Sequence, residues 1–333
     1  MLRGLNNHSQ DYWRALAEQP LSRSDTGSWV TARHAAARAV LAEPLLRGQP
    51  LLEGIGEIAG TSTETDVAPH AAEAWKRVLH QAAEGQLDVV AVARDAAVGA
   101  VAGLWGLSAS QTQELAVAVA LTDGAVDSSF YPQNLAHTRQ IAEGLTALRS
   151  LDPIGSSAER LLTAVVGIPM ATGLVVHAIA HQSTAKAGPG RTRTWDRLAV
   201  EPAYAEPVVS ETLRIAAPIQ LHATVADAPL DLAGQQIAAG DRVVVVLGAA
   251  NRDPEVFTAP DRFDPGRPNE QLAATLMPVA PQASVLPFAL VCARQGLAQL
   301  AARWPQLRPV GPAVRRTAAP VSQSLITYPV STA

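Results

Sequence analysis

The sequence predicts a mainly α-helical protein of the α+β class, folded as a single domain over residues 1–333. Three observations support this prediction. Hydrophobic residues make up 48% of the chain and charged residues 17%, a composition typical of a globular protein with a large core. Apolar stretches with helical spacing fill most of residues 1–200. Short β-branched runs and turn-forming sequence are gathered in residues 201–333.

The helices are predicted from apolar spacing and from boundary residues. Trp75, Val78, Leu79 and Ala82 recur at the spacing of one helix face, so an amphipathic helix is expected over 70–85. Ser108 and Gln111 have capping-box spacing and predict the start of another helix. Further helices are expected over 35–41, 87–107, 135–148, 161–180, around 211–214 and over 296–304.

Strands and loops fill the remaining sequence. Trp29–Thr31 is predicted to be a short strand. The β-branched runs Leu230–Ile237 and Val243–Leu247 flank Ala-Ala-Gly-Asp (238–241), which predicts that these two runs form a hairpin. The stretches 54–68 and 183–194 are rich in turn-forming residues and are expected to be loops.

Charge and cysteine content exclude several classes of function. The formal net charge is −4 and no basic stripe is present, so a nucleic-acid partner is not expected. The single cysteine, Cys292, excludes a disulfide within the chain and a metal site built from several cysteines. It fits a reducing compartment, and Met1–Gln10 does not have the pattern of a signal peptide. A cytoplasmic protein is therefore expected.

The stretch Leu161–Ala180 has no charged residue and is long enough to cross a bilayer. It contains Thr163, Pro169 and His177, and much of the rest is alanine and glycine. A buried central helix is therefore expected here rather than a membrane span.

Glu211 and Arg214 are three residues apart in an E-x-x-R motif on a predicted helix, so the carboxylate and the guanidinium share one face. Such pairs are common on helices, but here further motifs follow in a definite order along the chain. It runs through Ile237–Asp241, Ala250-Asn-Arg-Asp-Pro254 and Pro260-Asp-Arg-Phe263-Asp-Pro265.

This order resembles the C-terminal half of bacterial cytochromes P-450, the haem-thiolate monooxygenases. The resemblance is strong over Glu211–Pro268 and weaker elsewhere. It implies a truncated P-450-like fold in which Glu211, Arg214 and Arg262 form a buried structural triad. Because an isolated buried charge is costly, all three charges would have to be matched.

The chain departs from the P-450 pattern in the long helix over the haem. Active members carry G-x-[D/E]-T there, and the acid–alcohol pair delivers protons. The corresponding residues are Gly167-Ile-Pro169-Met170, and no acidic residue lies between Arg160 and Ala180. Pro169 and Met170 cannot relay a proton.

The residues that hold haem in the family are also replaced. The arginine that would bind a haem propionate falls at Thr224, with His222 as a weak substitute. Cys292 falls at the thiolate position, but the segment from Phe288 to Cys292 is three residues shorter than the family loop, and its glycines are absent. Since glycines let the family's loop wrap the thiolate, haem is not expected and Cys292 is interpreted as core.

The pattern of losses resembles P-450-like proteins that assist glycosyltransferases in macrolide and anthracycline biosynthesis. The resemblance implies a non-catalytic, haem-free protein that binds, stabilises and activates a deoxysugar glycosyltransferase in a stable hetero-oligomer. Two alternatives remain: a haem-thiolate enzyme of altered chemistry ligated through Cys292, and a small-molecule-binding or degenerate relative of the same fold.

Overall fold

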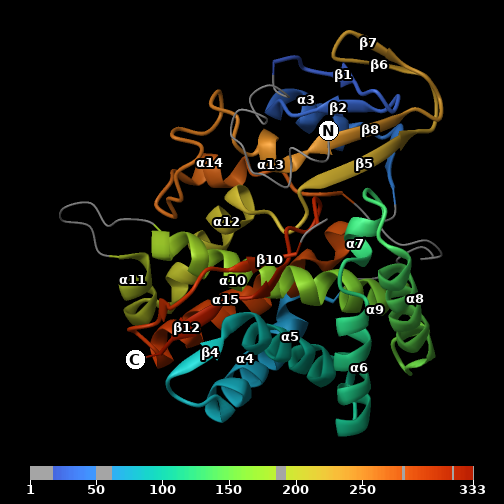
Figure 1. Ribbon diagram of the computed structural model, residues 1–333. Coiled ribbons are helices and arrows are strands. Elements are labelled where there is room, and N and C mark those ends of the chain that lie inside the picture. The colour runs from blue at the N-terminus through green and yellow to red at the C-terminus, as the bar shows by residue number, and fades with distance from the viewer. Residues whose placement is uncertain (1–17, 50–61, 185–192, 280–281, 317–318, 333) are drawn as a thin grey trace.

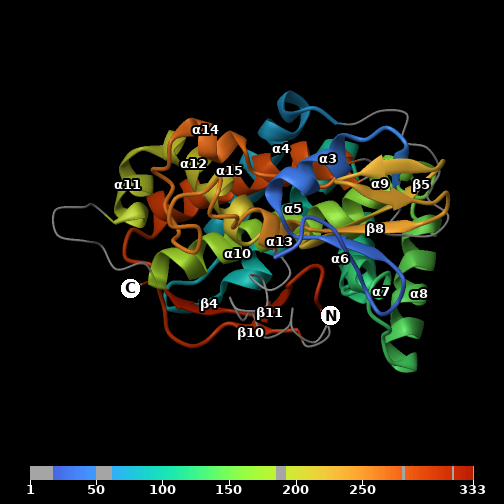
Figure 2. The same cartoon turned by 90° about the horizontal axis from the view of Figure 1, so that it is seen from above.

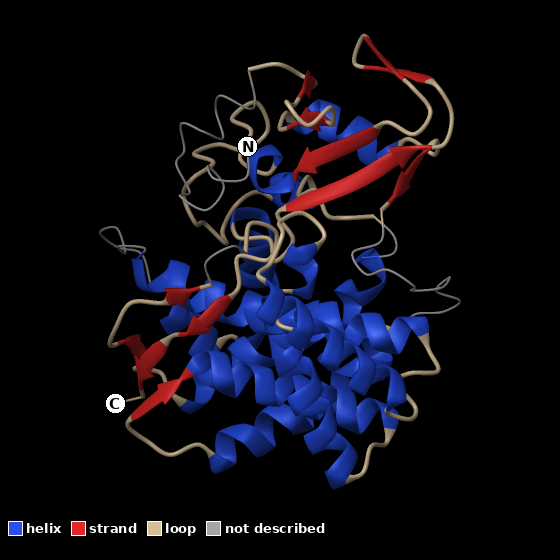
Figure 3. Cartoon of the chain, turned by 45° about the vertical axis from the view of Figure 1, so that its right-hand side comes forward, coloured by secondary structure: helices blue, strands red, loops and turns tan. Residues whose placement is uncertain are grey.

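The computed structural model describes residues 18–49, 62–184, 193–279, 282–316 and 319–332. Figure 1 shows a large helical part with a smaller sheet region above it, and Figure 3 shows that most of the strands gather in that upper region beside a few short helices. The mainly helical α+β prediction is confirmed.

Six long helices build most of the helical part, and α10 crosses its centre (Figures 1 and 2). α10 packs against α5, α12 and α15. The long helices are α4 (Glu64–Gln81), α5 (Val89–Trp105), α6 (Ala109–Leu121), α8 (Leu135–Ser150), α10 (Ile168–Thr184) and α15 (Leu286–Arg303). The shorter helices are α3 (His34–Ala42), α7 (Ala125–Ser128), α9 (Ala158–Leu162), α11 (Thr194–Val200), α12 (Ala205–Ile215), α13 (Leu247–Ala250) and α14 (Asn269–Ala273). Two 3₁₀ turns, η2 (Pro202–Tyr204) and η3 (Gln282–Val285), precede α12 and α15.

Two capping boxes fix helix starts. Ser108 and Gln111 form the one predicted for α6. At α4, Thr63 and Asp66 form a second box, so the helix begins at Glu64. The loop prediction for 54–68 is therefore wrong over 64–68, and 54–61 lies outside the described residues. The loop predicted over 183–194 overlaps the ends of α10 and α11, and 185–192 is likewise outside them.

The long central helix contains a π-helical segment, η1 (Thr163–Gly167), between α9 and α10. Pro169 lies two residues after its last residue, Gly167. Proline has no backbone N–H and its ring clashes with the carbonyl of residue i−4 in a regular α-helix, so the wider π turn accommodates it. The helix was predicted over 161–180, but this irregularity was not.

The main sheet has five strands in the order β1-β2-β8-β5-β3. β2 and β8 are parallel, and the other neighbours are antiparallel. The sheet therefore joins three N-terminal strands to two C-terminal ones. Its strands are β1 (Ser22–Arg23), β2 (Trp29–Thr31), β3 (Leu46–Gly48), β5 (Leu221–Ala226) and β8 (Arg242–Val246).

The predicted hairpin is wrong in its pairing. β6 (Leu230–Leu232) pairs with β7 (Gln235–Ile237) through Ala233-Gly234, whereas β8 pairs with β5 and β2. Ala233 and Gly234 both have positive φ, as a two-residue hairpin turn of this hand requires. The other small sheets contain β4 (Gln86–Asp88), β9 (Arg308–Pro309), β10 (Val314–Arg315), β11 (Leu325–Thr327) and β12 (Pro329–Ser331).

One cluster of buried apolar residues extends from Leu21 to Val330. Two helical stretches, Ala158–Gln182 and Ala283–Arg303, are long and apolar enough to span a membrane. However, 89% and 61% of their most apolar windows are buried inside the protein. Burial of this extent is that of core helices in a soluble protein.

Candidate functional site

A buried ion network lies where α12 meets the segment 251–267. Glu211 and Arg214 have fully buried side chains, and the Arg214 Nε and Nη2 atoms each donate to a carboxylate oxygen of Glu211 at 2.7 Å. Arg214 also donates to the backbone carbonyls of Asn251 and Pro260, both at 2.8 Å. The pair therefore ties α12 to the coil that follows α13.

The third charge of this network is Arg267, not the predicted Arg262. The Arg267 Nε donates to Glu211 Oε1 at 2.9 Å, and its side chain is 4% exposed. The Arg262 side chain is 57% exposed and lies 3.7 Å from Asp264. Only the backbone carbonyl of Arg262 joins the network, where it accepts from Arg214 and Arg267. The turn at Asp264–Gly266 brings the chain back to Glu211. Arg267 therefore reaches the Glu211 carboxylate, and Arg262 does not.

Cys292 lies inside a regular helix rather than on a loop. α15 begins at Leu286, ten residues earlier than the predicted start at 296, so the predicted ligand segment is helical. The cysteine is 1% exposed, and burial raises the pKa of its thiol. Because a metal ligand must be the thiolate, an apolar site of this kind opposes ligation.

The residues present do not fit a haem between the long helix and Cys292. A Cβ placed on Gly167 would lie 3.3 Å from Cδ1 of Phe288 and 3.4 Å from Cβ of Val285. The central helix therefore already contacts the start of α15 at van der Waals distance. A flat macrocycle has no room between surfaces that touch in this way.

The vestigial proton-relay residues face a small cavity. Pro169 and Met170 line a space of about 50 Å³ together with residues of α5, α6 and the C-terminal segment. Pockets for small organic ligands usually measure about 300–1,000 Å³, so this space is much too small for one. The Thr172 hydroxyl donates to the carbonyl of Ile168 at 2.9 Å, which is a contact within the helix.

Thr224, at the vestigial propionate position, is fully buried in β5, and its hydroxyl donates to the Val243 carbonyl at 3.3 Å. His222 is 1% exposed, and burial lowers its pKa to about 4. Its Nε2 has no hydrogen-bond partner within the described part of the chain. A neutral imidazole cannot replace a propionate-binding arginine. Within the described ranges, no group of three or more His, Cys, Asp or Glu residues is placed to hold a metal ion.

The sequence identified Arg294, two residues after Cys292, only as the replacement of a family glycine, and its ion pairs were not predicted. Arg294 bonds Glu64 of α4 at 2.7 Å and also bonds Glu206 of α12. The position carries glycine in the family loop, and the arginine there now links three helices. A signal for it was present, because a charged residue in an otherwise apolar segment commonly marks the solvent-facing side of a helix.

Comparison with known proteins identifies the fold class first. Residues 183–290 match the family model described as "Cytochrome P450". The crystal structure of P450BioI in complex with an acylated carrier protein superimposes with a TM-score of 0.80 over 99% of both chains, at 18% identity. Epothilone D-bound P450epoK gives a TM-score of 0.77 at 16% identity, over 99% of this chain and 97% of that one. The fold is that of the cytochromes P-450.

Sequence relatives then define the family. Protein AknT of Streptomyces galilaeus is 31% identical over 95% of this chain and 86% of its own length. Protein DesVIII of Streptomyces venezuelae is 31% identical over 96% and 84%, and EryCII of Saccharopolyspora erythraea, a cytochrome P450 family protein, is 32% identical over 99% and 91%. The chain belongs to the P-450-like family that these proteins represent. This is the auxiliary group that the motif losses predicted, rather than the catalytic monooxygenases.

Proposed function

We propose that this chain is a haem-free auxiliary protein that binds, stabilises and activates a deoxysugar glycosyltransferase in macrolide or aromatic polyketide antibiotic biosynthesis. The observation that supports the proposal most is the close approach of Gly167 to Phe288 and Val285, which leaves little space between the central helix and the start of α15. A P-450 framework without space for its cofactor has no cofactor chemistry to perform. Such a protein acts through its surface.

The intact framework supports action through a protein partner. The Glu211–Arg214–Arg267 network and the shared core keep the described chain together, so we propose one domain over residues 1–333. The surface carries large apolar side chains, among them Val117, Leu135 and Ile326, which are 50–66% exposed. Apolar side chains at the surface are suited to a lasting interface where they gather into one patch.

The complex we propose is a stable hetero-oligomer in the cytoplasm, with neither nucleic acid nor membrane involved. An interface of this kind buries about 1,200–2,000 Å² or more. The net charge of −4 and the single, buried cysteine are compatible with a reducing cytoplasm.

Co-expression with the glycosyltransferase encoded beside this chain tests the proposal. We expect the two proteins to elute together in size-exclusion chromatography, and the rate of sugar transfer to rise when this chain is present. A glycosyltransferase from an unrelated antibiotic cluster serves as the control. Separate elution together with an unchanged transfer rate would contradict the proposal.

A further inference from the structure

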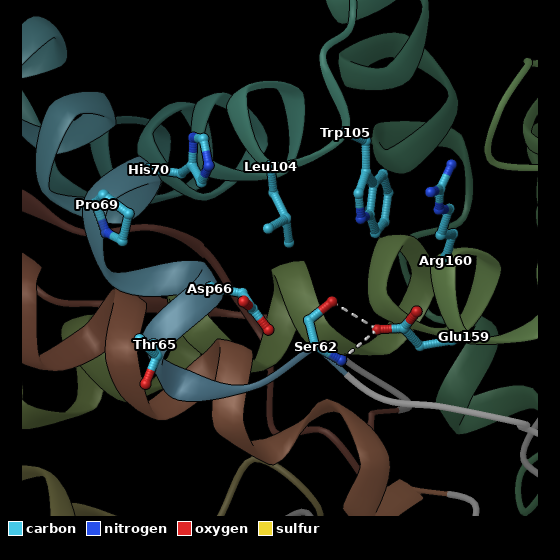
Figure 4. Close-up of a pocket in the computed structure, with 9 residues that line it drawn as sticks. All are labelled: Ser62, Thr65, Asp66, Pro69, His70, Leu104, Trp105, Glu159 and Arg160. Carbon is cyan, nitrogen blue, oxygen red and sulfur yellow. Dashed lines mark hydrogen bonds between the residues drawn. The ribbon is translucent and has the colours of Figure 1, made fainter.

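A second cleft lies away from the closed haem position, between the start of α4, the end of α5 and α9 (Figure 4). Its volume of about 560 Å³ is within the range of small-molecule sites. In Figure 4, Leu104 and Trp105 extend from α5 toward Asp66 and Ser62, and Glu159 lies beside Ser62. An indole wall therefore lies across from two carboxylates that come from different helices.

The two carboxylates are held in place and keep unused oxygens. Asp66 Oδ2 accepts from the backbone N–H and the hydroxyl of Thr63, at 3.0 and 2.7 Å. Glu159 Oε1 accepts from the N–H and the hydroxyl of Ser62, both at 2.8 Å. Oδ1 of Asp66 and Oε2 of Glu159 make no hydrogen bond or ion pair within the described part of the chain. Each carboxylate is thus oriented and can still accept from a ligand.

The charges in the cleft favour a cation. Bonds from Thr63 lower the pKa of Asp66, so this carboxylate stays ionised. Arg160 is the one permanent cation among the described lining residues. Its guanidinium lies 5.5 Å from the centre of the Trp105 ring and donates to the Pro153 carbonyl at 3.4 Å. Apart from His70, two carboxylates against one guanidinium give the described lining a net charge of −1.

The other lining groups suit a ligand that carries hydroxyls. The hydroxyls of Ser62 and Thr65 and the indole N–H of Trp105 can bond to ligand hydroxyls. His70 is one helical turn after Asp66, and its Nδ1 lies 2.9 Å from where a Cβ on Gly103 would stand, which leaves little room for the ring to move toward α5. The face of an aromatic ring attracts both a cation and the C–H face of a sugar-like ring.

We propose that this cleft binds a small hydroxylated amine in its protonated form, the chemical class that includes amino sugars. The ammonium group lies between Asp66 and Glu159 and donates hydrogen bonds to their carboxylates. The ring of the ligand packs on Trp105. This inference does not depend on the proposed glycosyltransferase partner.

Isothermal titration calorimetry with the full-length protein tests this inference. The probe is D-glucosamine at about pH 6.5, where an amine of this kind is mostly protonated. N-acetyl-D-glucosamine is the matched analogue without the charge. Because charge-assisted hydrogen bonds are about twice as strong as neutral ones, we expect the acetylated sugar to bind at least about tenfold more weakly. Equal binding of the two sugars, or no binding of glucosamine, would overturn the proposal.

Variants locate the binding. Glu159→Gln keeps an oxygen for Ser62 and should weaken glucosamine binding about tenfold; Asp66→Asn should do the same. Glu143→Gln, on the exposed side of α8, is the matched control and should leave binding unchanged. Thermal melts establish that each variant is folded, and Trp105→Phe provides a third test that leaves the helix caps intact. Unchanged binding in the Glu159 and Asp66 variants, or binding of inorganic phosphate in place of glucosamine, would assign the cleft a different ligand.

Discussion

The indole Nε1 of Trp75 donates a 2.9 Å hydrogen bond to the backbone carbonyl of Cys292. The thiolate position of the P-450 fold is thereby joined to α4, and both residues are about 1% exposed. The indole packs so closely on α15 that a Cβ on Gly296 would lie 2.3 Å from its Cζ2 atom. This contact makes α4 and α15 one packed unit at the point where the family holds its cofactor.

Gly296→Ala should therefore destabilise the protein. The added methyl group overlaps a buried ring that cannot move away, and overpacking of this kind costs about 1–3 kcal/mol. Gly173→Ala is the matched control, because its Cβ would meet no atom closer than 3.9 Å and it also lies in a helix. Chemical denaturation of both variants provides the measurement. Equal stability of the two variants would contradict the close packing of Trp75.

The two arginines after α12 should differ sharply in their contribution to stability. Arg267→Ala leaves a fully buried Glu211 with one cation fewer, which is expected to cost about 3–5 kcal/mol. Arg262→Ala changes an exposed side chain and should stay within about 0.5 kcal/mol. Thermal melting of the pair decides which arginine completes the network, and a larger loss for Arg262→Ala would reverse the assignment.

Burial of His222 should make stability fall in acid. Its pKa is about 4 in the folded protein against about 6.5 in the unfolded chain, so the unfolded chain binds more protons between these values. The stabilisation is fully present above about pH 6.5 and is lost as the pH falls toward about 4, amounting to about 3 kcal/mol.

Urea unfolding of the wild type and of His222→Gln over this range isolates the effect, because the other titrating groups are common to both proteins. The difference in the free energy of unfolding between the two should shrink as the pH falls. A difference that is independent of pH would show that the pKa of His222 is not lowered.

Purified protein expressed with added haem precursor should be colourless. Cys292 is helical and protonated, and Gly167 contacts the start of α15, so neither the ligand nor the space is present. Ultraviolet–visible spectra should show no Soret band, and Cys292→Ser should leave the spectrum unchanged. A stoichiometric Soret band that disappears in Cys292→Ser would support the haem-thiolate alternative.

The sequence was most informative where chemistry fixes spacing. The E-x-x-R pair and the Ser108 capping box follow from one helical turn, so both could be predicted from residue order. The choice between Arg262 and Arg267 could not, because it depends on how a turn folds back in three dimensions. The turn at Ala233-Gly234 was missed because alanine is a weak signal for positive φ. Gly240 also has positive φ, and for this reason the hairpin turn was predicted in the wrong loop.

Helix α15 shows the limit of prediction from a family resemblance. The resemblance places a loop before Cys292, yet Pro287 lies in the first turn of a helix that continues through the cysteine. Proline is favoured in that first turn, and Phe288 to Ala293 contains no glycine to break the helix. Local propensity would therefore have predicted this segment better than its position in the P-450 pattern did.

The transferase encoded beside this chain should become more resistant to heat when the two are mixed. A partner that binds only the folded state stabilises it by about 2.7 kcal/mol when its free concentration is a hundred times the dissociation constant. The melting temperature of the transferase should therefore rise with the concentration of this chain, without haem or sugar present. Cys292→Ser protein should give the same rise as the wild type, because Cys292 is buried and does not face a partner. A melting temperature that does not respond to the wild-type chain would show that any effect on sugar transfer is not caused by binding to the folded transferase.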